Sequence, residues 1–153
     1  MATLLQELLD ITSSLERNGI EYAVCGGLAM AIHGFARATM DIDLLIRAEN
    51  LEKTYQVAAT KGFDIKRLDM SFKERAVEIR RVSKIDDEGE VLSLDLLLIT
   101  PKVEDVWESR EQVSLSENIL CVVSKAGLIK MKTLAGRPQD LADIERLQND
   151  ETS

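Results

Sequence analysis

The chain has 153 residues, of which 45% are hydrophobic and 30% are charged, and its net charge at neutral pH is −8. This length predicts one domain over residues 1–153 with a core of its own, and the acidic balance disfavours a dedicated nucleic-acid-binding protein. No apolar run approaches the roughly 20 residues that cross a bilayer, so no membrane partner is expected.

Alternating helices and strands are predicted along the first third of the chain. Leucine and isoleucine recur at helical spacing over residues 4–15, and Asn18 with Gly19 ends that helix. The next predicted elements are a strand over residues 20–26, a short helix over 28–34 and a second strand over 41–46.

Two features of the sequence bear on the compartment. The N-terminal helix carries Glu7 and Asp10, which does not fit a secretory signal. Cys25 and Cys121 lie in apolar runs, which suits buried free thiols in a reducing compartment better than a disulfide. We therefore place the protein in the cytoplasm.

The middle of the chain is rich in strands. A helix over residues 50–62 precedes three predicted strands, at 63–68, 76–82 and 90–100, and the turn-like sequence DDEG joins the last two. This pattern favours a mixed β-sheet with helices packed on it over a doubly wound parallel sheet. We therefore predict an α+β fold.

The C-terminal part is mainly helical. A short helix opens at Pro101, a last strand covers residues 118–123, and two helices follow, one capped by Ser124 and one starting at Pro138. These two helices form a C-terminal helical pair. Within the single domain, residues 124–150 could act as a helical flap on the sheet.

Residues 61–84 form a locally basic segment in this acidic protein, with eight basic residues against four acidic ones. Two interpretations stay open. The segment could form a basic wall that faces a polyanion, or it could be a solvated sheet edge that its charges protect from aggregation.

Three aspartates stand in strands where apolar residues are expected. Asp41 and Asp43 flank Ile42, and residues two apart in a strand share a face, so their carboxylates point the same way. Asp95 is a lone acid among apolar neighbours, where an unpaired carboxylate would cost several kcal/mol, so we expect it to meet the same cation. Three oxygen ligands favour Mg²⁺ or Mn²⁺ over zinc.

Gly26 and Gly27 lie where the first strand gives way to the short helix. Glycine lets a backbone approach a ligand closely, and the N-terminus of a helix offers free amides to a phosphate. A Gly-Gly pair is by itself usually just a turn. Beside the three acids, it predicts a phosphate-binding turn next to a metal site.

The order of these residues resembles the signature of the DNA polymerase β-like nucleotidyltransferase superfamily. A glycine pair follows a hydrophobic strand, and thirteen residues separate Gly27 from the Asp-hydrophobic-Asp run at Asp41, at the upper end of the family's spacing. The stretch HGFARATMDIDLLI is similar to small bacterial nucleotidyltransferase-like proteins that include abortive-infection toxins. The tail LIKMKTLAGRPQDLADIERL is similar to the same group.

The resemblance implies roles for the acids and the glycines. Asp41 and Asp43 match the two metal-binding acids, and Asp95 matches the third, which would also take the proton of the attacking hydroxyl. Gly26 and Gly27 match the phosphate-holding turn, although relatives often have a serine at the second position and Gly27 offers no hydroxyl. If Asp95 only repels its neighbours when no metal is bound, Asp95→Asn should melt at or above the wild type.

Three further residues match the family pattern and are candidates for nucleotide binding, namely Arg37, Lys132 and Asp140. On residue chemistry alone, Lys132 on its amphipathic helix is expected to point to solvent, and Asp140 is expected to stabilise the start of the last helix. Arg37 could equally pair with surface acids. We expect His33, at a helix end, to be structural.

The resemblance implies a Mg²⁺-dependent nucleotidyltransferase that uses two metal ions, moves a nucleoside monophosphate from a nucleoside triphosphate such as ATP to an acceptor hydroxyl and releases pyrophosphate. The acceptor could be an RNA end, a protein hydroxyl or a small molecule. The alternative is an inactive module with the same fold that serves as an antitoxin, adaptor or nucleotide sensor with a cognate protein partner. A third interpretation is an unrelated protein in which the acids hold a structural cation or lie in water at a strand end.

Overall fold

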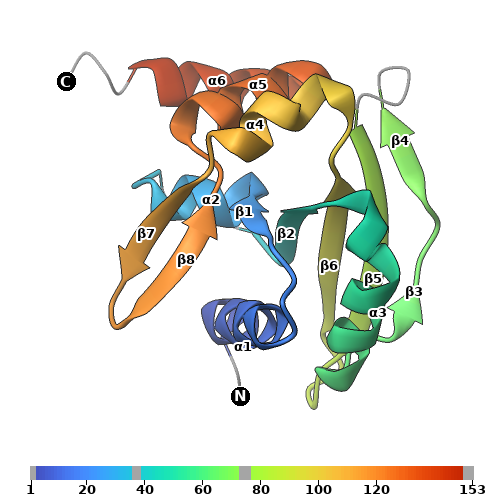
Figure 1. The fold of residues 1–153 in the computed structure, drawn as a ribbon. Helices are drawn as coiled ribbons and strands as arrows, with labels where there is room; N and C mark the ends of the chain where they lie inside the picture. The colour runs from blue at the N-terminus through green and yellow to red at the C-terminus, as the bar shows by residue number, and fades with distance from the viewer. Residues whose placement is uncertain (1–2, 36–38, 73–76, 150–153) are drawn as a thin grey trace.

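The computed structural model describes residues 3–35, 39–72 and 77–149, and a mixed sheet of eight strands runs through this part of the chain (Figure 1). The strands are β1 (Ala23–Cys25), β2 (Asp41–Ile46), β3 (Ile65–Lys66), β4 (Met70–Phe72), β5 (Val77–Ile85), β6 (Val91–Leu98), β7 (Glu111–Leu115) and β8 (Asn118–Val122). The helices are α1 (Leu4–Arg17), α2 (Gly26–Ile32), α3 (Leu51–Thr60), α4 (Glu104–Glu108), α5 (Lys125–Ala135) and α6 (Pro138–Asn149), with 3-10 turns at Ala48–Asn50 and Pro101–Val103.

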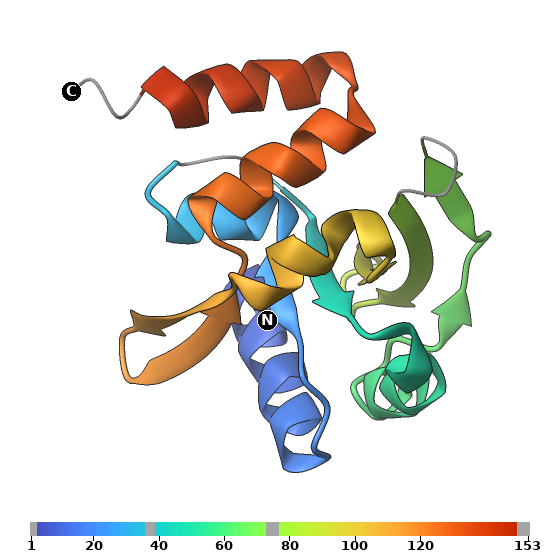
Figure 2. The same ribbon diagram turned by 45° about the horizontal axis from the view of Figure 1, so that its top comes forward.

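The strand order is β3-β5-β6-β2-β1-β8-β7, and β4 pairs with β5 outside this path. The pairs β2/β6 and β1/β8 are parallel, whereas β1/β2, β5/β6 and β7/β8 are antiparallel. Figure 2 shows the β7–β8 hairpin and the β3–β4 segment at opposite ends of the sheet. The two central strands, β2 and β6, carry the three predicted acids.

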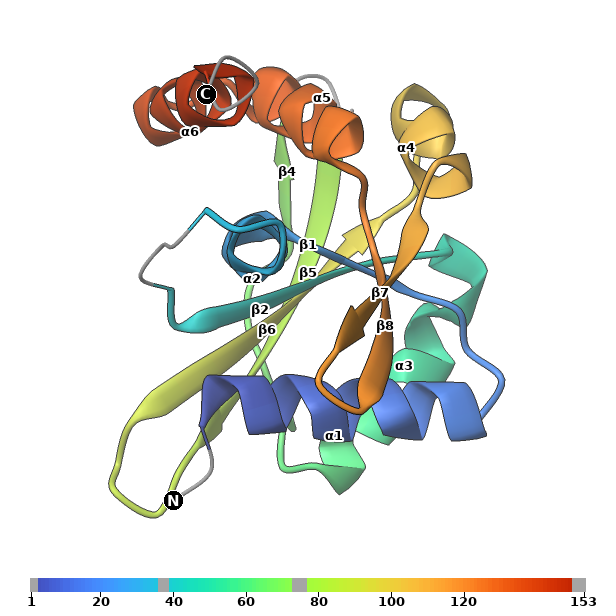
Figure 3. The ribbon, with the colours of Figure 1, turned by 90° about the vertical axis from the view of Figure 1, so that its left-hand side faces the viewer.

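Helices cover both faces of the sheet. Helices α1 and α3 lie against one face, while α2 and the α5–α6 pair lie on the other side (Figure 3). Every second residue of β2 and β6, such as Leu44 and Leu96, is fully buried, and these residues belong to one hydrophobic core with the apolar residues of α1. The alternate residues of both strands therefore face α2 and α5.

The predicted α+β class, with a mixed sheet and a C-terminal helical pair, is confirmed. Two short strands, β4 and β7, were not predicted, and the first strand is shorter than expected because α2 already begins at Gly26. Strand β4 has only three residues, and three of the five residues of β7 are exposed, so neither shows the apolar run that marks a buried strand.

The basic segment over residues 61–84 forms strands β3, β4 and β5, at the edge of the sheet. Several of its cations are paired within the protein. Arg80 contacts Asp69 and Glu78, and Lys84 donates to Glu7 at the far end of the same strand. These contacts favour the interpretation of a charged sheet edge over that of a basic wall.

Two further expectations can be compared with the structure. Within the described residues, the helices are all too short or too polar to cross a membrane. Cys25 and Cys121 are both free thiols, Cys25 fully buried and Cys121 partly so.

Candidate active site

A cavity of about 280 Å³ lies between the sheet and the helices α2, α5 and α6. Its walls bring together seven of the eight predicted site residues, which come from four separate stretches of the chain: Gly26, Gly27, Asp41, Asp43, Asp95, Lys132 and Asp140. Arg37, the eighth, lies outside the described residues.

Strand register brings the three acids together. Strands β2 and β6 run parallel, and Asp43 is paired with Asp95 while Asp41 is paired with Ser93. Paired residues of neighbouring strands project to the same face, so all three carboxylates point toward the cavity. One register, shared by two apolar strands, therefore assembles a cluster from residues that are more than fifty positions apart in sequence.

Gly26 has a backbone and a neighbour that exclude a side chain. Its φ is +68°, and a Cβ atom built on it would lie 2.1 Å from Oδ2 of Asp43. The first residue of α2 is thus packed directly against a carboxylate of the cluster. Glycine is required here both for the left-handed backbone and for the close approach.

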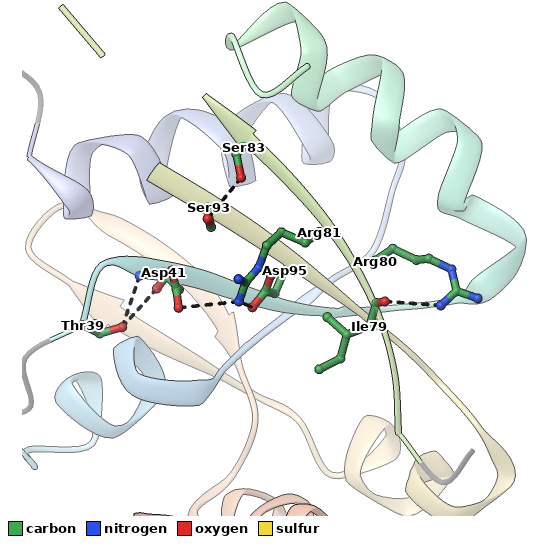
Figure 4. A network of polar contacts seen from close by, with 8 residues as sticks. All are labelled: Thr39, Asp41, Ile79, Arg80, Arg81, Ser83, Ser93 and Asp95. Atoms are coloured by element: carbon green, nitrogen blue, oxygen red, sulfur yellow. Dashed lines mark hydrogen bonds and ion pairs between the residues drawn. The ribbon is translucent and has the colours of Figure 1, made fainter. Parts of the chain in front are cut away.

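Gly27 lies beside Thr39, which the sequence did not single out. A Cβ atom on Gly27 would come within 3.0 Å of the Thr39 Cβ atom and 3.2 Å of its hydroxyl oxygen. That hydroxyl also contacts the backbone nitrogen of Asp41 at 3.3 Å (Figure 4). Thr39 therefore brings a hydroxyl to the turn where Gly27 has none.

Burial and close spacing disfavour the simultaneous ionisation of these acids. Burial, with the neighbouring carboxylates of Asp95 and Asp41, raises the pKa of Asp43 from 3.8 to about 8. Burial and Asp95 also raise the pKa of Asp41, against the opposing effect of the Arg81 guanidinium. A cation bound here would relieve both shifts.

Arg81 supplies a cation that the sequence did not predict. It stands on β5 directly opposite Asp95, and its Nε and Nη2 atoms donate to Oδ1 and Oδ2 of Asp95 at 2.6 and 2.9 Å. Nη2 also lies 3.9 Å from Oδ2 of Asp41. Figure 4 shows the guanidinium between the two carboxylates, whereas Arg80 points away from them.

This ion pair corrects the expectation for Asp95. The carboxylate was expected to be unpaired without metal, and that premise is wrong because it receives two hydrogen bonds from one guanidinium. Replacing it by an amide removes an ion pair rather than only relieving repulsion. The prediction that Asp95→Asn melts at or above the wild type is therefore replaced by an expected loss of stability.

The residues present fit a divalent cation in their chemistry. Among the described residues, no group of three acidic, histidine or cysteine side chains is arranged to hold a metal ion as it stands. Arg81 donates to both oxygens of Asp95, so this carboxylate is already engaged by a cation of the protein. The donors are nevertheless carboxylate oxygens, and burial beside two other carboxylates raises the pKa of Asp43, a shift that a bound cation would oppose.

Lys132 and Asp140 belong to a buried ion network between α5 and α6. Lys132 is only 7% exposed, so the expectation that it points to solvent is wrong. Its Nζ lies 3.0 Å from Asp143 and 3.8 Å from Asp140. Asp140 accepts a hydrogen bond from the backbone nitrogen of Arg137, so it stabilises the start of α6 as expected. Although burial opposes it, the Arg137 side chain lowers the pKa of Asp140.

His33 has a structural partner, as expected. Its Nε2 lies 2.9 Å from the carbonyl oxygen of Val123, at the end of the neighbouring strand β8. This contact ties the end of α2 to the segment that leads into α5.

The cavity also has an apolar wall, which the sequence did not reveal. Met70, Ile79 and Leu97 continue the same sheet face beyond the acids, and Leu128 with Met131 faces them from α5. The cavity therefore has a charged half, where β2 begins, and a hydrophobic half over β4, β5 and β6.

The geometry defines the class of fold, which is that of the nucleotidyltransferases. No protein-family model and no curated protein sequence matches the chain. Among solved structures, a proposed nucleotidyltransferase from Thermotoga maritima is similar over 95% of this chain and 92% of its own, with a TM-score of 0.65 and 16% identity. At this identity the likeness shows the fold.

Two antibiotic-modifying proteins share the same fold. The lincosamide adenylyltransferase LnuA, in its lincomycin-bound form, is similar over 94% of this chain and 95% of its own, with a TM-score of 0.60 and 17% identity. ANT(2")-Ia, in complex with adenylyl-2"-tobramycin, is similar over 97% of this chain and 90% of its own, with a TM-score of 0.61 and 16% identity. The predicted nucleotidyltransferase fold is thereby confirmed.

Proposed function

We propose that the protein is a metal-dependent nucleotidyltransferase. It would move a nucleoside monophosphate from a nucleoside triphosphate to an acceptor hydroxyl. The observation that carries this proposal is the register of β2 and β6, which puts Asp43 beside Asp95 and next to Asp41 at the edge of a cavity. The fold shared with two adenylyltransferases supports it.

Each part of the charged half has a role in this proposal. Asp41 and Asp43, with Asp95 as a third carboxylate, would hold Mg²⁺ or Mn²⁺, which when bound neutralises the charge of the phosphates. The triphosphate would lie along the Gly26–Gly27 turn, with the Thr39 hydroxyl as a further donor. The buried network of Lys132 and Asp140 would shape the opposite wall, at the α5–α6 pair.

The reaction would be a displacement at phosphorus. The acceptor oxygen would form a bond to the α-phosphorus, the bond from that phosphorus to the bridging oxygen would break, and pyrophosphate would leave. Asp95 would take the proton of the acceptor hydroxyl. Positioning and charge neutralisation supply most of the rate in such a site, because no covalent intermediate is needed.

The apolar half of the cavity favours a small molecule as acceptor. Met70, Ile79 and Leu97 offer a hydrophobic wall next to Asp95, and a polyanion such as RNA would gain little from it. Two basic residues of the nearby sheet edge, Arg80 and Lys84, are already paired with acids. Lincomycin is the molecule bound in LnuA, which supports a compact hydroxyl-bearing acceptor here.

A second function is favoured by one observation. Arg81 already donates to both oxygens of Asp95, so the carboxylate that would take the acceptor's proton is occupied, which favours a module that binds nucleotide or a cognate protein without catalysis. Such a module would act as an antitoxin, adaptor or nucleotide sensor in a bacterial cell.

Labelled nucleotides test the proposal and separate these functions. The purified protein is incubated with Mg²⁺, a small-molecule extract and ATP labelled either at the α-phosphate or at the γ-phosphate. We expect the α-label in a new product that mass spectrometry identifies, and the γ-label in pyrophosphate. Asp41→Asn with Asp43→Asn is the control. Transfer by neither protein, with ATP binding retained by the wild type, would support the binding module instead.

A further inference from the structure

We propose that Arg81 is a resident counter-ion that competes with the metal for Asp95 and moves to the phosphates when a nucleotide binds. Metal binding would then be weak until the nucleotide arrives, because the nucleotide draws the guanidinium away from Asp95. This inference rests on the proposed function and adds a coupling between its two ligands.

The hydrogen bonds of Arg81 conflict with a metal at the same carboxylate. Its two donors use both oxygens of Asp95, at 2.6 and 2.9 Å. A divalent ion at Asp95 would need one of these oxygens and would lie against the guanidinium, so the two cations would repel one another. Each cation therefore weakens the binding of the other to Asp95.

Arg81 cannot release Asp95 by losing its proton, because its guanidinium stays charged. The hydrogen bond and charge of Asp95 raise the pKa of Arg81 above its already high ordinary value, although burial opposes the shift. A guanidinium carries its charge at every pH that a protein tolerates. The charge can leave Asp95 only when the side chain changes its conformation.

The side chain has room to move, and the acid does not. The side chain of Arg81 is 30% exposed, whereas that of Asp95 is 7% exposed. Arg81 lines the cavity, and its Nη2 already approaches Asp41 at 3.9 Å. Guanidinium groups bind phosphate oxygens with paired hydrogen bonds, as they bind carboxylates, so a triphosphate in this cavity offers an alternative partner of the same geometry.

The adjacent arginine provides a matched control. Arg80 precedes Arg81 on β5, and alternation along the strand turns it away from the acids (Figure 4). It pairs with Asp69 and Glu78 instead. Loss of a positive charge at residue 80 changes the net charge as much as loss at residue 81, but leaves Asp95 occupied.

Titration with Mn²⁺ alone, followed by electron paramagnetic resonance, tests the competition without any turnover. We expect Arg81→Ala and Arg81→Gln to bind Mn²⁺ at least about tenfold more tightly than the wild type, because Asp95 becomes available. Arg80→Ala should bind like the wild type. In an Asp95→Asn background, the gain from Arg81→Ala should disappear, as expected for two residues that act through one contact.

A second titration measures the other half of the coupling. With EDTA present, α,β-methylene ATP should bind Arg81→Ala about tenfold more weakly than the wild type and Arg80→Ala, since the guanidinium would no longer reach the phosphates. The Gln variant loses the charge but keeps a donor, so it serves if the Ala variant does not fold.

The outcomes separate this inference from the proposed function. Equal or weaker Mn²⁺ binding by both Arg81 variants, when the wild type binds Mn²⁺ with nucleotide present, would overturn the competition and leave the function intact. Tighter binding that also occurs in Arg80→Ala would show a general charge effect and would overturn it as well. Absence of Mn²⁺ and nucleotide binding in every protein would overturn both.

Discussion

At the scale of single residues, Gly26 tests whether α2 has to lie against the acids. Gly26→Ala meets both a left-handed backbone and the Asp43 carboxylate, while Gly19 has φ +70° and no atom within 4 Å of an added Cβ atom. Gly19→Ala should therefore cost about 1 kcal/mol for the backbone alone, and Gly26→Ala about 3 kcal/mol or more. Urea unfolding of both variants measures the difference, and equal costs would contradict the close contact.

Asp43 predicts a pH dependence of stability. Its pKa is raised from 3.8 to about 8, so the folded protein holds this proton more tightly than the unfolded chain does. The stability from this group is complete below about pH 4 and is lost as the pH rises through about 8. The amide of Asp43→Asn does not titrate.

We therefore expect the melting temperature of Asp43→Asn, without metal, to rise relative to that of the wild type between pH 5 and pH 9. Melting curves in EDTA at several pH values provide the measurement. A difference that stays constant over this range would mean that Asp43 is ionised throughout.

At Asp95, unlike at Asp43, we expect replacement of the acid by an amide to lower the stability of the metal-free protein. Asp95→Asn weakens a two-point ion pair with Arg81, so we expect a loss of about 1–3 kcal/mol in metal-free urea unfolding. Asp105→Asn, which breaks an exposed pair with Lys130, is the control and should leave the unfolding midpoint unchanged. An Asp95→Asn protein at or above wild-type stability would show that the ion pair does not form in solution.

The acids and glycines could be predicted from sequence, but Arg81 could not be predicted from its own neighbours. A carboxylate inside an apolar strand is conspicuous, because burial without a partner is costly. By contrast, an arginine in a segment with many basic residues does not stand out. Thr39 and the apolar cavity residues were missed for the same reason, since each is an ordinary residue type in its local sequence.

At the scale of elements, the hairpin between β5 and β6 contained the signal for Arg81. The turn DDEG was predicted, and its geometry fixes the pairing of the two strands. Asp86 donates its backbone nitrogen to the carbonyl oxygen of Glu90, and Gly89 has φ +83°. Counting outward from this turn places Arg81 opposite Asp95, so a register argument could have found the pair.

The α5–α6 pair depends on the buried network at Lys132. Lys132→Met removes the charge that faces Asp140 and Asp143, both of which are buried, and should cost about 3–5 kcal/mol in urea unfolding. Lys130 lies two residues earlier, on the exposed side of α5, so Lys130→Met should unfold like the wild type. Similar midpoints for both variants would mean that the network does not stabilise the packing of the two helices.

At the scale of the whole molecule, the strand order follows from contacts that local sequence does not encode. The mixed character of the sheet was predicted from the run of strands in the middle of the chain. The position of β2 between β1 and β6 was not predicted. The parallel pairing of β2 with β6 joins segments that are about fifty residues apart in sequence.

The central claim is that Asp41 and Asp43 form a metal and nucleotide site with the Gly26–Gly27 turn. Calorimetric titration of α,β-methylene ATP with Mn²⁺ into the wild type and into Asp41→Asn with Asp43→Asn tests it most directly. We predict binding to the wild type and a loss of at least about 100-fold in the double variant, with both proteins folded by circular dichroism. Equal affinity in the two proteins, or no binding to either, would contradict the account.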